Sequence, residues 1–225
     1  SANGSRSTAR YSFFGSEPYL TLSGRGQEHH VEEAGRATVA AGSAFEALGR
    51  ILGGSVISPI EGIPPFFGGA VGYLSYDLVR SFESLPSLAT DDVGLPDMHL
   101  ACFDLVAAVD HLTNQLYLMY CPPLSRFAAE PREKLYREGR DRLAELEARL
   151  TSPRPPATFH AWPRTATLVP NQSREAYTAR VRRCQDYIGA GDIYQANLSH
   201  RFTLNLDAAA PRPEITAYAT ALYGR

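Results

Sequence analysis

Residues 191–202 hold the side chains whose types and spacing could do chemistry. The segment reads Gly-Asp-Ile-Tyr-Gln-Ala-Asn-Leu-Ser-His-Arg-Phe, and its polar and apolar residues alternate with a period of two. In an extended strand, such residues point to opposite sides. One side then carries Gln195, Asn197, Ser199 and Arg201, whose amide, hydroxyl and guanidinium groups could hold a polar, anionic small molecule. The alternative is an ordinary half-exposed strand without a ligand.

The elements before this segment have clear signals. Ser173 is placed to cap a helix in which Tyr177, Val181, Cys184 and Ile188 share a face, and Gly189 and Gly191 are placed to end it. The strand 193–202 should follow. Upstream, the patterns predict a hairpin of strands 11–22 and 27–31, a helix at 44–52, a buried strand at 68–75, a helical turn at 76–82, a hairpin of strands 99–111 and 115–120, and a helix at 131–150.

Residues 151–172 contain five prolines and no sustained period, which predicts a linker. We therefore expect an α+β chain with a mostly β N-terminal domain over residues 1–150. Residues 173–225 would begin a second domain. The chain starts without Met and stops within a plausible apolar helical stripe over residues 213–222, so we expect an N-terminal fragment of a longer protein.

Composition excludes several functional classes. The 225 residues carry a net charge of -2, and basic and aromatic residues share no face, which argues against a nucleic-acid partner. No apolar run is long enough to span a membrane, so we expect a cytoplasmic protein with no membrane partner. The three cysteines, Cys102, Cys121 and Cys184, lack metal-ligand spacing and are expected to be free thiols, and we expect no metal ligands in this chain.

Several stretches, in the same order along the chain, resemble the chorismate-utilising enzymes, in particular the large subunits of aminodeoxychorismate synthase and anthranilate synthase. They are Arg-Tyr-Ser-Phe-Phe-Gly-Ser-Glu-Pro at 10–18, Phe-Gly-Gly-Ala-Val-Gly-Tyr at 67–73, Tyr-Asp-Leu-Val-Arg at 76–80, Phe-Glu-Ser-Leu-Pro at 82–86, Leu-Pro-Asp-Met at 95–98, and the segment at 191–202. The resemblance implies a layered α/β sandwich with antiparallel sheets that face each other across a substrate cleft.

The resemblance also implies a substrate, a cofactor and a partner. The substrate would be chorismate, the cofactor Mg²⁺, and the partner a glutamine amidotransferase subunit or domain that supplies ammonia. Family members are roughly twice as long as this chain, and the Mg²⁺ ligands are expected in the C-terminal half. The fragment alone is therefore expected to be inactive.

Gln195 matches a position that distinguishes two chemistries in this family. The relatives that use water carry a Lys there, which acts as the base for the attacking water, whereas the relatives that use ammonia carry Gln. An uncharged amide cannot deprotonate water, but ammonia is nucleophilic without a strong base. The resemblance thus implies that Gln195 is a catalytic residue of an aminating enzyme, with Asn197 and Ser199 as substrate-pocket candidates. The alternative is a structural strand amide.

Two further expectations rest on the resemblance. The sequence Tyr-Gln-Ala-Asn-Leu at 194–198 favours aminodeoxychorismate synthase, on the route to p-aminobenzoate and folate, over anthranilate synthase, on the route to tryptophan. Ser1, Arg10 and Tyr11 match positions that line a tryptophan pocket in many relatives and are tryptophan-binding candidates. The competing class of function is a non-catalytic, amino-acid-binding regulatory module.

Overall fold

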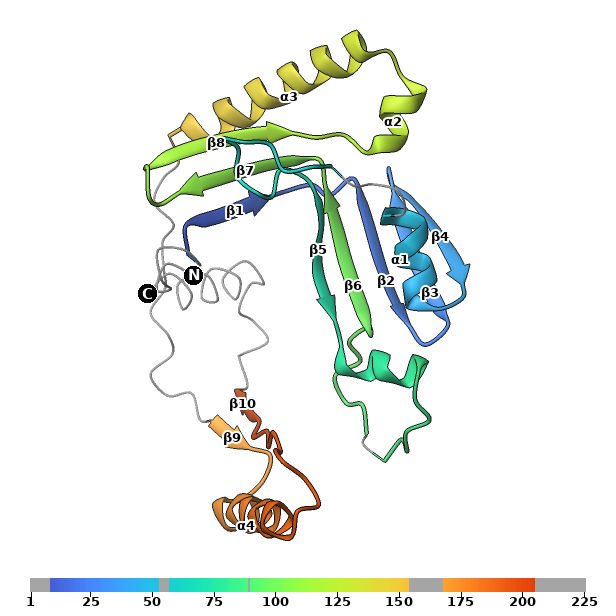
Figure 1. The fold of residues 1–225 in the computed structure, drawn as a ribbon, viewed down its shortest axis with the longest axis vertical. Coiled ribbons are helices and arrows are strands. Elements are labelled where there is room, and N and C mark those ends of the chain that lie inside the picture. The colour runs from blue at the N-terminus through green and yellow to red at the C-terminus, as the bar shows by residue number, and fades with distance from the viewer. Residues whose placement is uncertain (1–8, 53–56, 89, 154–167, 205–225) are drawn as a thin grey trace. The chain divides into compact units, whose positions relative to one another are not determined.

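The computed structural model describes residues 9–52, 57–88, 90–153 and 168–204 (Figure 1). The chain divides into two compact units, residues 1–152 and residues 153–225. The described strands form antiparallel sheets only, and helices accompany them in both units. This mixture confirms the predicted α+β class.

A five-stranded antiparallel sheet in the order β4-β3-β2-β6-β5 forms one part of the first unit (Figure 1). Its strands are β2 (Leu20–Arg25), β3 (Glu28–Glu33), β4 (Arg36–Ala41), β5 (Gly69–Leu74) and β6 (Met98–Phe103). The turn between β2 and β3 lies at residues 26–27, where Gly26 has a φ of 58°. The hairpin predicted around the glycines at 24 and 26 is therefore confirmed.

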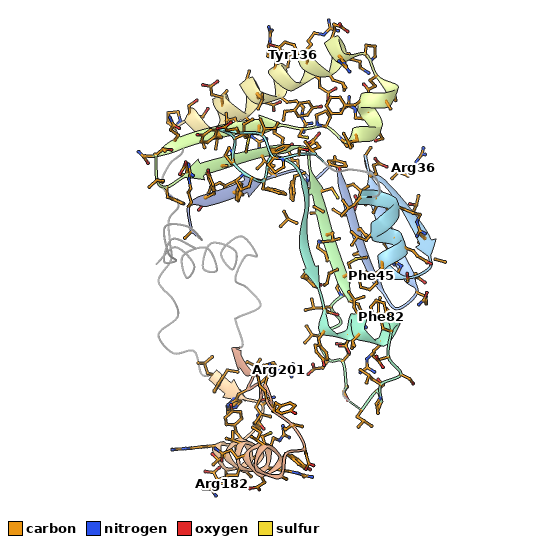
Figure 2. The ribbon with its side chains drawn as sticks, in the orientation of Figure 1. Arg36, Phe45, Phe82, Tyr136, Arg182 and Arg201 are labelled. Atoms are coloured by element: carbon orange, nitrogen blue, oxygen red, sulfur yellow. The ribbon has the colours of Figure 1, made fainter. Side chains whose placement is uncertain are left out.

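The core of this sheet lies under α1 (Ala44–Leu52) and the short 3-10 helix η1 (Tyr76–Ser81). Alternate residues of β2 point to the same face, so Leu20 and Leu22 are both buried there. The other buried members of the cluster are Ala44, Ala47, Leu78, Met98 and Cys102. Phe45 of α1 and Phe82 after η1 lie beside each other, with ring centroids 5.1 Å apart (Figure 2).

A three-stranded sheet in the order β1-β7-β8 completes the strands of the first unit. It consists of β1 (Tyr11–Gly15), β7 (Leu105–Asp110) and β8 (Gln115–Tyr120), and its strands run across the direction of the larger sheet (Figure 1). The turn from β7 to β8 includes Asn114, which has a φ of 56°. Asn tolerates this left-handed conformation better than most residues, and it lies between the strands predicted at 99–111 and 115–120.

Two helices, α2 (Leu124–Ala129) and α3 (Arg132–Thr151), follow β8, and α3 packs on that strand (Figure 1). Gly139 is buried on the packed face, where a Cβ would lie 2.5 Å from the Tyr120 ring. Arg142 of α3 forms an ion pair with Asp104, the residue between β6 and β7. The helix predicted at 131–150 is confirmed.

The second unit contains β9 (Leu168–Pro170), α4 (Arg174–Ala190) and β10 (Phe202–Leu204). The Ser173 hydroxyl accepts a hydrogen bond from the Ala176 amide at 3.2 Å, and Gly191 adopts the left-handed conformation with a φ of 84°. Both predicted ends of this helix are therefore confirmed. β9 lies in the proline-rich stretch that was expected to be a linker, so part of that stretch is a strand.

Two strand predictions were wrong in length. Residues 11–22 and 99–111 were each expected to form one strand, but each divides into two strands that belong to different sheets. The chain turns between β1 and β2 near Glu17, which has a φ of 57°, and between β6 and β7 at Asp104. The alternation of polar and apolar residues indicates which side chains are buried but not which sheet buries them. The alternation can therefore continue through such a turn.

The strand predicted at 193–202 was also wrong, because only residues 202–204 are a strand. A strand needs a partner that supplies backbone hydrogen bonds, and the three residues of β9 pair only with those of β10. The strand predicted at 68–75 is present as β5 but is mostly exposed, because it is an edge strand of the sheet. The apolar stripe at residues 213–222 lies outside the described residues.

Candidate functional site

The polar segment at residues 192–201 follows directly from the end of α4. The Gly191 amide donates to the Ile188 carbonyl at 3.1 Å, and the Asp192 amide donates to the Tyr187 carbonyl at 3.0 Å. Such bonds occupy the last carbonyl groups of a helix and reverse the chain, and glycine permits the positive φ that they need. The first end of the segment is therefore held by the helix itself.

The other end of the segment is held by the loop between β9 and α4. The Asn171 amide donates to the Arg201 carbonyl at 2.9 Å, and the Arg201 amide donates to Asn171 Oδ1 at 3.2 Å. Gln172 Nε2 also donates to the Ser199 carbonyl at 3.4 Å. These contacts hold the backbone before β10 without a long β-ladder.

The last residues of the segment contact the first turn of α4. The His200 ring stacks on Tyr177 of α4, with centroids 5.3 Å apart, and lies 4.4 Å from the Phe202 ring. Tyr194, on the same predicted side, is fully exposed within this unit. The predicted separation of a buried apolar side from an exposed polar side is thus present close to β10 but not at residue 194.

The predicted site residues Gln195, Asn197 and Ser199 are all exposed on the second unit. Gln195 and Asn197 contact each other: Gln195 Nε2 donates to Asn197 Oδ1 at 3.2 Å. Residues two apart in an extended chain lie on the same side, which places the two amides within reach. The structure therefore joins two of the three residues into one amide pair. The roles of all three in binding and catalysis remain predictions.

Arg10, a tryptophan-binding candidate, forms an ion pair within the first unit. Its guanidinium donates to both oxygens of Asp110, with Nη2 2.7 Å from Oδ2 and Nε 3.1 Å from Oδ1. The Asp110 side chain is fully buried, and the hydrogen bonds from Arg10 hold the pKa of this carboxyl well below its usual range. The guanidinium also lies over the ring of Tyr11, 4.8 Å from its centroid.

This ion pair bears on the predicted tryptophan site in two ways. Nε and Nη2 of Arg10 already donate to Asp110, so fewer of its five N–H donors remain to hold a ligand carboxylate. Ser1, the third candidate, lies outside the described residues. Asp110 was not predicted as a partner of Arg10. Its carboxylate also caps the following turn, because its Oδ1 accepts from the Leu112 amide at 2.9 Å.

A cleft of about 520 Å³ lies between β8, α2 and α3 in the first unit. Its lining is mainly apolar and aromatic, with Phe127 and Tyr136 among the lining residues, and Arg132 and Arg140 complete it. None of the predicted site residues that the structure describes lines this cleft.

The described residues provide no metal centre and no membrane span. Among residues 9–52, 57–88, 90–153 and 168–204, no group of three or more His, Cys, Asp or Glu side chains could hold a metal ion. The described residues therefore offer no set of ligands for the Mg²⁺ that the resemblance implies. That its ligands lie in a C-terminal half stays a prediction. No described helix has the length and apolar character needed to cross a bilayer. All three cysteines are free thiols, as predicted.

Two curated relatives represent the two synthases between which the sequence left a choice, anthranilate synthase and aminodeoxychorismate synthase. The chain is 43% identical over 157 residues to anthranilate synthase component 1 of Thermus thermophilus, an alignment that spans 68% of this chain and 32% of that protein. It is 32% identical over 195 residues to aminodeoxychorismate synthase component 1 of Escherichia coli, which spans 86% of this chain and 39% of that protein. The chain thus spans between about a third and two fifths of the length of these relatives.

The fold also matches a solved structure. The crystal structure of anthranilate synthase component I from Streptococcus pneumoniae superimposes with a TM-score of 0.70 at 19% identity, over 96% of this chain and 46% of that one. This likeness shows that the chain has the anthranilate synthase component I fold.

The family profile of the chorismate binding enzymes matches residues 5–220, which is nearly the whole chain. It includes both the Arg10–Asp110 pair of the first unit and the Gln195–Asn197 pair of the second. The chain therefore belongs to the chorismate binding enzyme family.

Proposed function

We propose that the full-length protein containing this chain aminates chorismate to 4-amino-4-deoxychorismate, on the route to p-aminobenzoate and folate. The nitrogen comes from ammonia that a glutamine amidotransferase partner releases. The observation that carries the proposal is Gln195, a neutral amide on the exposed polar side of the segment after α4.

The chemical argument concerns the nucleophile. Ammonia attacks through its own lone pair and needs no protein base to become reactive, whereas water does. A glutamine amide can accept and donate hydrogen bonds but carries no titratable proton near neutral pH. Gln195 can therefore hold a nitrogen nucleophile and cannot generate a hydroxide ion, which favours amination over hydration.

The choice of product rests on the residues around Gln195. The run Tyr-Gln-Ala-Asn-Leu at 194–198 resembles the pattern of aminodeoxychorismate synthases. A second candidate is anthranilate synthesis, which the 43% identity to the Thermus thermophilus protein favours. Both reactions begin with the same substrate and the same nucleophile, so Gln195 has the same role in either case.

The cofactor and the partner are part of this proposal. Bound Mg²⁺ would hold the ring carboxylate of chorismate and polarise the leaving hydroxyl, through ligands outside the described residues. The names of both relatives include "component 1", which supports a second component as the source of ammonia. We assign that role to the glutamine amidotransferase.

A single assay of the full-length protein tests the proposal. Chorismate, Mg²⁺ and an ammonium salt are mixed with the enzyme, and the products are separated by chromatography and identified by mass. Aminodeoxychorismate is the expected product. Anthranilate alone would favour the second candidate, and isochorismate alone would contradict an aminating role for Gln195.

A parallel titration addresses the regulatory module. Calorimetry of the full-length protein with tryptophan and with chorismate separates a sensor from an enzyme. Tight binding of tryptophan without binding of chorismate would favour an amino-acid-binding module over the proposed enzyme.

A further inference from the structure

We infer that Asn197 is a positioning residue that fixes the orientation of the Gln195 side-chain amide, so that its carbonyl oxygen faces the incoming ammonia. The inference rests on the proposed function. It adds a residue that would act on the nucleophile through Gln195 without touching the ring of chorismate.

The hydrogen bond between the two amides defines this orientation. Gln195 Nε2 donates to Asn197 Oδ1 at 3.2 Å. Rotating the Gln195 amide by half a turn would bring its oxygen against Asn197 Oδ1, and two acceptors in contact repel each other. With the Asn197 amide oriented as in this structure, its Oδ1 favours the state in which the NH₂ group of Gln195 is occupied and its Oε1 is available.

The backbone around Asn197 is held at both ends of the segment, which limits the positions that its side chain can take. Before it, the chain leaves α4 through the left-handed Gly191. After it, Gln172 Nε2 contacts the Ser199 carbonyl, and the His200 ring stacks on Tyr177. An acceptor on a restrained backbone loses less conformational entropy when it orients a neighbour than one on a free chain would.

The orientation matters because ammonia has three N–H donors and one lone pair. In the net reaction, the ammonia lone pair forms the C–N bond, the C–O bond to the hydroxyl breaks, and one ammonia proton leaves with the hydroxyl as water. An amide oxygen accepts one N–H and leaves the lone pair free for the ring carbon. An inverted amide would instead donate to that lone pair and occupy the electrons that must form the new bond.

Steady-state kinetics of the full-length enzyme test this role with three variants. Asn197→Leu has a similar volume but no acceptor, and we expect the KM for ammonia to rise roughly three- to tenfold, the effect of one lost hydrogen bond. The KM for chorismate and the Tm should stay at the wild-type values. Asn197→Asp keeps an acceptor at the same position and should restore the KM for ammonia. Arg182→Gln, on the exposed surface of α4 (Figure 2), is the matched control and should change neither KM.

The outcomes distinguish this inference from the proposed function. A wild-type enzyme that does not use ammonia overturns both. A wild-type enzyme that uses ammonia, combined with an unchanged ammonia KM in Asn197→Leu, overturns the positioning role alone. A rise of both KM values together with a lower Tm in that variant would show a structural role for Asn197 and also overturn the inference.

Discussion

Arg10 and Asp110 lie 100 residues apart in the sequence and form a bidentate ion pair, in which the guanidinium donates to both carboxylate oxygens at 2.7 to 3.1 Å. The pair ties the residue before β1 to the last residue of β7, next to the Tyr11–Asp110 position in the register of the two strands. The same carboxylate also orders the following turn through the Leu112 amide. One buried side chain therefore fixes the edge of the three-stranded sheet and its hairpin.

Replacing Asp110 with Asn should lower the Tm of the protein by several degrees. The variant loses the charge that pairs with Arg10 and leaves a neutral amide on the buried side chain against a guanidinium that is 39% exposed. Thermal unfolding followed by circular dichroism provides the measurement. Asp77→Asn is the matched control, because it removes an exposed ion pair with Arg80 and should have little effect.

The same pair predicts an acid dependence. The pKa of Asp110 is depressed in the folded state by the hydrogen bonds from Arg10, so its stabilising contribution is present above the unfolded pKa, near 4. It is lost as the pH falls below that value, since the unfolded chain then binds the proton more readily. A wild-type stability curve below pH 4 that is no steeper than that of Asp110→Asn would contradict this origin.

His29 provides a second pH-dependent term, at higher pH. The ring is buried against Gly24, whose Cβ position it fills, and burial followed by the nearby charge of Arg50 lowers its pKa below 6.5, although Asp97 partly opposes this shift. A lowered pKa means that the unfolded state takes up the proton first, so stability should fall as the pH drops below about 6.5. Denaturant titrations at pH 7.5 and 5.5 measure the effect, and His29→Phe, which cannot titrate, should reduce the difference.

Two glycines in helices should respond in opposite directions to replacement by Ala. In α4, a Cβ on Gly189 meets nothing within 4 Å, so Gly189→Ala should stabilise the helix by about 0.5–1 kcal/mol. In α3, a Cβ on Gly139 would lie 2.5 Å from the Tyr120 ring, and moving the helix or the ring should cost about 1–3 kcal/mol. Denaturant titration of both variants provides the comparison. Equal stabilisation by the two substitutions would show that α3 does not pack on β8 through Gly139.

Replacing Gln195 with Leu separates its catalytic role from a structural one. The side chain is exposed on the second unit, so the Tm should change little. If the amide holds ammonia, the kcat/KM for ammonia should fall roughly ten- to hundredfold, as expected when a positioned polar contact to the nucleophile is lost. Normal amination kinetics in this variant would contradict a catalytic role and show that Gln195 is an ordinary surface amide.

Local signals predicted α1, α3 and α4 well, whereas α2 (Leu124–Ala129) was not predicted. Ser173 and Gly191 bound α4 as the sequence indicated, and the predicted helix at 131–150 matches α3 within one or two residues. Helix ends depend on residues three or four positions apart, whose contacts form within the element itself. Strand ends were less predictable, because they depend on which distant strand supplies the hydrogen bonds.

The sequence by itself determined the α+β class, the boundaries of α1, α3 and α4, and the family resemblance, since these depend on residue types and short spacings. Only the tertiary structure decided that Arg10 faces Asp110 and that residues 193–201 are not a strand. Both outcomes depend on pairing between segments far apart in the chain, and a local sequence pattern does not indicate which distant segment a strand or side chain will pair with. The contact between Gln195 and Asn197 lies between these cases: the period of two predicted their common side, and the held backbone of the segment brings their amides into contact.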